Sequence, residues 1–131
     1  MRPQTILVVD DSSSIRSILK VYLMGLKAEV LDAESGERAL QLARLLPLSL
    51  MIVDINMPGM DGLTLVDKVR HDSRAAVAKL PVILLTSDRS EASRARMREV
   101  GANDLLYKPV TAETLLAAAG RLLRLEKAAG T

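Results

Sequence analysis

Three carboxylates, a hydroxyl and an ammonium each follow a short apolar run in this sequence of 131 residues. Short apolar runs are typical of strands buried on both faces of a parallel sheet, and ligands of such sheets bind outside the carboxyl ends of the strands. If the runs are parallel strands, the polar groups that follow them meet at one edge of the sheet. The candidates for chemistry are therefore Asp10, Asp11, Asp54, Thr86 and Lys108.

Three carboxylates at one sheet edge need a compensating cation. At a separation of roughly 5 Å, each pair repels by about 3 kcal/mol at an effective dielectric constant of about 20. A small number of oxygen ligands suits Mg²⁺, which keeps several waters and often shares its coordination shell with a phosphate. A carboxylate beside a divalent cation, a lysine and a hydroxyl is what phosphoryl transfer onto an aspartate requires. Asp54 is the candidate nucleophile.

A plainer interpretation is that these acids only cap helices. Asp54 precedes Pro58 and Gly59, which turn the chain, so it could cap the helix that follows. Asp10 and Asp11 could form a capping pair in the same way. The elements that position all five side chains have to decide between these interpretations.

Five strands alternate with five helices in the predicted pattern. This alternation predicts an α/β fold, a (βα)5 doubly wound parallel sheet of five strands with helices on both faces. Residues 72–79 are expected to be the frayed end of the third helix and a loop. The strands are expected at residues 4–9, 28–31, 48–54, 80–85 and 104–107, and the helices at residues 12–24, 36–46, 61–71, 90–100 and from 111 onward.

Apolar residues recur with the helical period of about 3.6 residues in several of these helices. Caps are expected at Asp61, Ser90 and Thr111, and Gly101 is expected to end the fourth helix. The apolar positions are Ile15, Ile18, Leu19, Tyr22 and Leu23 in the first helix, Ala39, Leu40, Ala43 and Leu46 in the second, and Leu115, Ala118, Ala119, Leu122 and Leu123 in the last.

Length and composition predict a single domain over residues 1–131 with its core in about 4–125. Without Phe or Trp, that core has to be aliphatic. The absence of Cys excludes disulfides and thiol catalysis. No signal peptide or long apolar run is present, so we expect a cytoplasmic protein that does not contact membranes. A net charge of +2 without a basic and aromatic tract gives no indication of nucleic-acid binding.

The motifs resemble the receiver domain of two-component response regulators, particularly the single-domain chemotaxis type. The resemblance covers residues 4–125 and rests on five positions in the family's order and spacing. It implies a flavodoxin-like sheet with strand order 2-1-3-4-5. The motifs are Asp10-Asp11, Asp54 with Asn56-Met57-Pro58-Gly59-Met60-Asp61-Gly62 behind it, Thr86-Ser87 and Lys108-Pro109.

The resemblance also implies a role for each site residue. Asp54 would be the phosphoacceptor, and Thr86 the switch hydroxyl that turns toward the phosphoryl group. Asp11, Asp54 and the backbone carbonyl of Asn56 would ligate Mg²⁺ directly, with Asp10 acting through water. Lys108 would pair with the phosphoryl group, and the Lys108-Pro109 peptide would be cis.

One position departs from the family pattern. Three residues before the lysine the family usually has an aromatic residue that moves inward with the threonine, and here that residue is Leu105. Strand alternation puts Tyr107 on the same side of the sheet. Either Leu105 repacks with a smaller change, or Tyr107 takes over part of the role.

The implied partners are a sensor histidine kinase or histidine phosphotransfer protein, and a downstream protein at the face of the fourth helix, fifth strand and fifth helix. Such a module is not an enzyme and catalyses only its own aspartyl phosphorylation and dephosphorylation. The arginines of the fourth helix fit either this partner face or a plain solvated surface. A dehalogenase-type phosphatase would need an Asp where Asn56 stands, and a flavin or nucleotide binder would need a glycine-rich phosphate loop. A receiver-like interaction module that is never phosphorylated stays open as the alternative.

Overall fold

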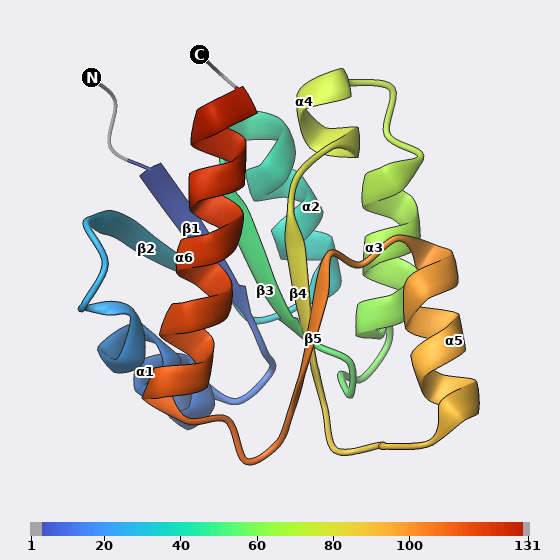
Figure 1. The fold of residues 1–131 in the computed structure, drawn as a ribbon. Coiled ribbons are helices and arrows are strands. Elements are labelled where there is room, and N and C mark those ends of the chain that lie inside the picture. Colours follow the sequence, from blue (N-terminus) through green and yellow to red (C-terminus); the bar gives the residue numbers. More distant parts are fainter. Residues whose placement is uncertain (1–3, 130–131) are drawn as a thin grey trace.

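The computed structural model describes residues 4–129 and their side chains as far as Leu123. Residues 1–3 and 130–131, which the predicted domain includes, lie outside the described residues. Five parallel strands form one sheet in the order β2-β1-β3-β4-β5, which confirms the predicted fold class and strand order (Figure 1). The strands are β1 (Gln4–Val9), β2 (Ala28–Ala33), β3 (Leu50–Asp54), β4 (Val82–Thr86) and β5 (Asp104–Tyr107).

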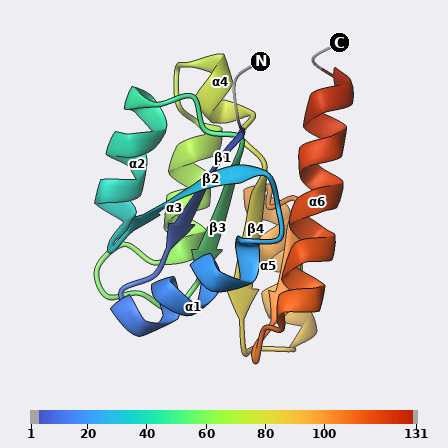
Figure 2. The same cartoon turned by 90° about the vertical axis from the view of Figure 1, so that its left-hand side faces the viewer.

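Helices cover both faces of the sheet. The two helices α1 and α6 pack together on one face, whereas α2, α3 and α5 follow one another across the other (Figures 1 and 2). None of the helices within residues 4–129 has the length and hydrophobicity that a membrane span requires. The helices are α1 (Ser13–Leu23), α2 (Gly36–Leu45), α3 (Gly62–Arg70), α4 (Ala75–Ala78), α5 (Glu91–Val100) and α6 (Ala112–Ala129).

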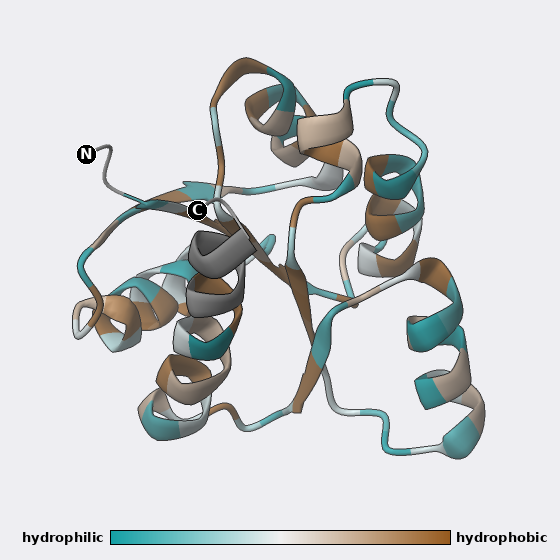
Figure 3. Cartoon of the chain, turned by 45° about the horizontal axis from the view of Figure 1, so that its top comes forward, coloured by the Kyte–Doolittle hydropathy of each residue, from teal (hydrophilic) through white to brown (hydrophobic). Residues whose placement is uncertain are grey.

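The core is aliphatic, as the composition predicts, and the sheet divides it into two layers. Along β1, Leu7 and Val9 belong to the layer under α2 and α3, and Ile6 and Val8 to the layer under α1 and α6. All five residues of β3 and of β4 are buried, as expected for central strands of a parallel sheet. In Figure 3 the strands at the centre are largely brown, whereas α5 is largely teal.

The predicted helix caps are present. Asp61 accepts a hydrogen bond from the backbone N–H of Thr64 (2.8 Å), and Ser90 accepts one from Ser93 (3.1 Å). The Oγ1 of Thr111 accepts the N–H of Thr114 at the start of α6 (3.2 Å). Gly101 ends α5 with a φ of +94°, a left-handed conformation in which a side chain would be strained.

The structure corrects several predicted boundaries. Residues 75–78 form the short helix α4 instead of a loop, because Val77 is buried and anchors one turn. Strand β2 continues to Ala33, and β4 starts at Val82, after Pro81, and ends at Thr86. The second helix ends at Leu45, so Leu46 is not on a buried face; its side chain is exposed just before Pro47.

The first helix also buries fewer residues than its periodicity indicates. Leu19 and Leu23 are buried, but Ile15 and Ile18 are 39% and 45% exposed. The reason is the neighbouring helix: α6 contacts β3 and β5, so α1 lies over β1 and β2 beside it and only a narrow stripe of α1 faces the sheet (Figure 2). Periodicity identifies the apolar side of a helix but not how much of that side a neighbour covers.

Arg70, at the end of α3, ties together the α4–β4 and α5–β5 connections at the amino edge of the sheet. Its guanidinium donates to the carbonyl oxygens of Gly101 (2.9 Å), Ala78 (3.1 Å) and Leu80 (2.7 Å). It also donates to Oδ1 of Asn103 (2.7 Å), which in turn accepts the N–H of Val82 (2.8 Å) at the start of β4.

Replacing Arg70 should therefore lower the stability of the whole domain. Arg70→Met keeps the aliphatic stem and removes every donor, so we expect the free energy of unfolding to fall by about 2–4 kcal/mol. Urea unfolding followed by circular dichroism measures this. The control is Arg96→Met on α5, an exposed position where the change should stay within about 0.5 kcal/mol. Equal stabilities of the two variants would contradict a tying role for Arg70.

Candidate functional site

The acidic residues meet where β1 and β3 end side by side. Val9 and Val53 are register partners in these strands, so the next residues, Asp10 and Asp54, leave neighbouring strand ends together. One carboxylate oxygen from each of Asp10, Asp11 and Asp54 lies within 4.8 Å of the others. Asp10 and Asp54 are buried, and Asp11 is exposed. The sequence pattern thus correctly predicts that the three acids converge.

Asp54 is paired with Lys108 across the sheet. The Lys108 ammonium donates to Oδ1 of Asp54 at 2.7 Å, and the side chains are 34% and 6% exposed respectively. The backbone N–H of Asn56 donates to the same oxygen (3.3 Å), so the backbone of Asn56 lies beside the carboxylate as well. The Lys108-Pro109 peptide is cis, as predicted. Lys108 also donates its backbone N–H to the carbonyl of Thr86 (2.8 Å).

The loop that follows Asp54 folds back closely on the strand end. The N–H of Gly62 donates to the carbonyl of Ile55 (2.9 Å). A Cβ at Gly62 would lie 2.7 Å from the carbonyl oxygen of Asp54, so only glycine allows this approach. Gly59 has a φ of +74° in the same loop. The glycines therefore keep the loop against the acidic edge.

The pKa of Asp10 is raised to about 6, mainly by burial and also by the adjacent Asp54 carboxylate, against the lowering effect of the Ser12 hydrogen bond. That bond runs from the Ser12 N–H to Oδ1 of Asp10 (2.8 Å). The three carboxylates and the Lys108 ammonium together carry a formal charge of −2. A divalent cation would compensate this charge and restore a normal acidity to Asp10. The residues present therefore fit a metal ion with oxygen ligands.

Arg16 is a member of the site that sequence reasoning missed. Its NH1 donates to the backbone carbonyl of Asp10 (2.8 Å), and its Nε donates to Oδ2 of Asp32 (2.6 Å). Lys20 pairs with the other oxygen of Asp32 (2.7 Å), and the Lys20 and Arg16 hydrogen bonds hold the pKa of Asp32 below its usual range. Asp32 lies near the carboxyl end of β2, one residue beyond the predicted end of that strand. An acid at a strand end was therefore the sequence signal that could have identified Asp32 as a partner for a basic residue such as Arg16.

Thr86 lies at the next strand end but is not bonded to Asp54. The register partner of Asp54 is Leu85, and Thr86 follows it, with only 1% of its surface exposed. Its Oγ1 accepts the N–H of Asp88 (3.0 Å), so the hydroxyl is engaged by its own loop. Asp88 in turn accepts the N–H of Ser90 (2.9 Å). The loop between β4 and α5 is thus closed by a short chain of hydrogen bonds that begins at Thr86.

Leu105 and Tyr107 have different surroundings. Leu105 packs against the apolar layer that contains Met97 of α5, whereas Leu106 packs on the opposite face of the sheet. Tyr107, the register partner of Thr86, has the guanidinium of Arg89 stacked 4.3 Å from its ring centroid. Arg89 belongs to the loop between β4 and α5. A cation–π contact therefore joins this loop to β5 next to Thr86.

Known proteins resemble this chain in sequence and in fold. The model of the response regulator receiver domain family matches residues 6–120. Chemotaxis protein CheY1 of Helicobacter pylori is 41% identical over 112 residues, which are 84% of this chain and 89% of that protein. The structure of Vibrio cholerae chemotaxis protein CheY4 matches with a TM-score of 0.85 and 35% identity, over 92% of this chain and 99% of that one.

Longer regulators also match. Transcriptional regulatory protein SrrA of Staphylococcus aureus is 33% identical over 119 residues, which are 91% of this chain but 47% of that protein. The chain thus spans about half the length of this relative and nearly all of the chemotaxis protein. Together with the acidic edge formed by Asp10, Asp11 and Asp54, these likenesses show that the chain belongs to the response regulator receiver domain family, in its CheY-like form.

Proposed function

We propose that the chain accepts a phosphoryl group on Asp54 from a histidine kinase or a histidine phosphotransfer protein. The observation that carries this proposal is the buried pair of Asp54 and Lys108 at a strand end beside two further aspartates. Helix capping does not account for it, because the carboxylate of Asp54 is bound to a lysine 54 residues away. The protein would then act as a signalling module rather than as an enzyme on other substrates.

The transfer is a displacement at phosphorus. A carboxylate oxygen of Asp54 attacks the phosphorus of a phosphohistidine, the new O–P bond forms as the N–P bond breaks, and the freed imidazole nitrogen takes a proton from water. The Lys108 ammonium, 2.7 Å from Oδ1, is placed to compensate charge on the transferring group. The backbone N–H of Asn56 holds the carboxylate in a fixed orientation.

Mg²⁺ is the metal ion that we assign to this donor set, since its protein ligands are few and all are oxygens. Asp11, Asp54 and the carbonyl of Asn56 would hold the ion, and Asp10 would act through a bound water. When bound, the ion neutralises charge and orients the phosphoryl group. Arg16 is a positioning residue in this scheme, because it binds the carbonyl of Asp10 while Asp32 and Lys20 hold it in place.

The signal leaves the site through Thr86. A phosphoryl group on Asp54 offers the Thr86 O–H a strong acceptor, and the side chain turns toward it, which moves Oγ1 away from the N–H of Asp88 that it now accepts. One hydrogen bond to a charged group contributes about 1.5–3 kcal/mol, whereas a shift from 1:99 to 99:1 needs about 5.5 kcal/mol. Thr86 alone is therefore insufficient, and Leu105 buries less surface than an aromatic residue would. We expect a partial shift.

The partner face that we propose consists of α5, β5 and α6, which are the predicted fourth helix, fifth strand and fifth helix. Arg96 and Arg98 are exposed there, and of the residues of α5 only Met97 is buried. The named relatives act in chemotaxis and in transcriptional regulation, and either kind of output could use this face. The alternative function, a receiver-like interaction module that is never phosphorylated, predicts no dependence on Mg²⁺.

Phosphorylation is tested with acetyl phosphate. In the presence of Mg²⁺ we expect one phosphoryl group per chain, located on Asp54, because among the described residues that carboxylate alone pairs with Lys108. Intact mass and peptide mapping measure it, with Asp54→Asn as the variant and Asp67→Asn, an exposed residue of α3, as the matched control. Equal labelling of Asp54→Asn and the wild type would refute the assignment.

The raised pKa of Asp10 gives a pH dependence with a definite sign. The folded protein binds this proton more tightly than the unfolded chain, so in the absence of metal the contribution of Asp10 to stability falls as pH rises from about 4 to about 6. Asp10→Asn should remove that fall and raise the free energy of unfolding at pH 7 by about 1–3 kcal/mol. Urea unfolding at several pH values in EDTA measures both effects.

Adding Mg²⁺ should raise the free energy of unfolding at neutral pH, because the ion compensates the ionised Asp10 carboxylate. The increase should be smaller below pH 6, where protons compete with the ion for Asp10. Glu113→Gln, an exposed change on α6, is the control and should leave both profiles as in the wild type. If the free energy of unfolding depended on pH in the same way in the wild type and in Asp10→Asn, the ionised Asp10 carboxylate would not destabilise the protein at neutral pH.

The stack of Arg89 on Tyr107 should restrain the switch in the unphosphorylated protein. An exposed cation–π contact contributes about 0.5–1 kcal/mol, so Arg89→Ala should increase the unphosphorylated active fraction roughly two- to fivefold. NMR shifts of α5 and β5 with and without beryllofluoride measure the populations, and Arg96→Ala is the control. A complete shift in the wild type that also survives Tyr107→Ala would show that aromatic packing does not govern the switch.

A further inference from the structure

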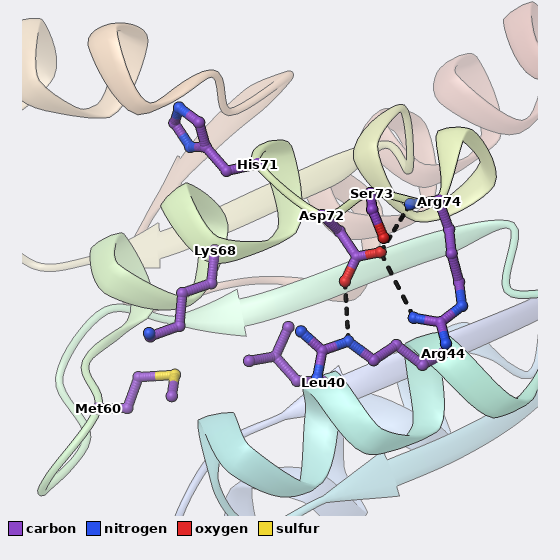
Figure 4. Close-up of a pocket in the computed structure, with 8 residues that line it drawn as sticks. All are labelled: Leu40, Arg44, Met60, Lys68, His71, Asp72, Ser73 and Arg74. Atoms are coloured by element: carbon purple, nitrogen blue, oxygen red, sulfur yellow. Dashed lines mark hydrogen bonds and ion pairs between the residues drawn. The ribbon is translucent and has the colours of Figure 1, made fainter.

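A second polar site lies between α2 and α3, away from the acidic edge. It is an open cleft of about 450 Å³, and the side chains in Figure 4 line it. Leu40 of α2 and Met60 of the loop after β3 supply an apolar surface. The sulfur of Met60 packs against Gly36. A Cβ at Gly36 would lie only 2.7 Å from this sulfur, so the absence of a side chain there leaves room for Met60. The volume lies in the range of small-ligand pockets, and because the cleft is open, a ligand bound there would keep one side in solvent.

The rest of the lining is predominantly cationic. Arg44 of α2, Lys68 of α3 and Arg74 carry fixed positive charges, and Asp72 is the one acid among the described lining residues. Their formal charge is therefore +2. His71 also lines the cleft, and its Nδ1 donates to the carbonyl of Asp67 (2.8 Å).

Asp72 organises these cations. Its side chain is only 2% exposed, its Oδ2 accepts from Nε of Arg44 (2.8 Å), and its Oδ1 accepts the backbone N–H of Arg74 (2.9 Å) (Figure 4). The Arg44 bond uses Nε only, so the two terminal nitrogens of that guanidinium remain as donors. Lys68 forms no ion pair with another of the described residues and lies beside Met60 in Figure 4.

We propose that this cleft binds an organic phosphomonoester of about the size of a nucleoside monophosphate. The dianion of such a ligand matches the +2 charge of the lining, and its apolar body matches the surface of Leu40 and Met60. Arg44 is pre-organised by a buried carboxylate, so little conformational entropy is lost when it binds an anion. The binding does not depend on phosphorylation of Asp54.

The test is an NMR titration of the Asp54→Asn protein in EDTA with adenosine monophosphate, inorganic phosphate and adenosine as separate probes. We expect saturable shifts of Arg44, Lys68 and Arg74 with the monophosphate, weaker binding of phosphate, and none of adenosine. Lys68→Gln should weaken monophosphate binding about tenfold, the loss of one charge-assisted contact. Arg38→Gln, an exposed change on α2 outside the cleft, is the matched control and should bind as the parent protein does.

Several outcomes would overturn the proposal. Equal affinity for phosphate and the monophosphate would show that the apolar surface adds nothing. Equal weakening by Lys68→Gln and Arg38→Gln would show diffuse attraction to a basic surface. Absence of shifts at the cleft would show that the arginines serve only to join α2 to the segment after α3. Because Asp54 is replaced and metal is removed throughout, none of these results bears on phosphoryl transfer.

Discussion

The ion pair between Asp54 and Lys108 is the interaction on which the acidic edge depends. It connects the end of β3 to the residue after β5 and so passes over the end of β4, where Thr86 lies. Three strand ends are thereby held in one arrangement. Lys108 lowers the pKa of Asp10 only in part, so burial and the neighbouring Asp54 carboxylate still raise that pKa to about 6. The strand ends are thus held together, but one ammonium does not balance the charge of three carboxylates.

A sheet buried on both faces makes this arrangement possible. The residues of β3 and β4 cannot carry polar groups along their length, so chemistry is confined to their ends. Parallel topology then places all those ends at one edge, whatever their separation in sequence. The cleft between α2 and α3 has a different origin, because it depends on residues at helix surfaces and at the end of α3 rather than on strand ends.

Local patterns predicted the parallel sheet and the convergence of the acids, because strand length, alternation with helices and strand-end residues are properties of short segments. The order of the strands followed only from the resemblance to receiver domains. They failed where the outcome depends on distant neighbours. The exposure of Ile15 follows from the position of α6, and α4 forms because Val77 finds a buried place. Arg16 and Arg70 were not assigned because their partners include residues 16 and 31 positions away. The strand-end acid Asp32 was the available signal for Arg16, and nothing local marks the pairs of Arg70.

The scarcity of aromatic residues has an optical consequence. The chain has no tryptophan and only two tyrosines, Tyr22 on α1 and Tyr107 at the end of β5. Tyr22 packs into the layer under α1 and α6, whereas Tyr107 carries the guanidinium of Arg89 on its ring next to Thr86. In a chain with Tyr22 replaced by phenylalanine, all tyrosine fluorescence would come from Tyr107. Movement of the loop between β4 and α5 could then be followed in real time without any attached label.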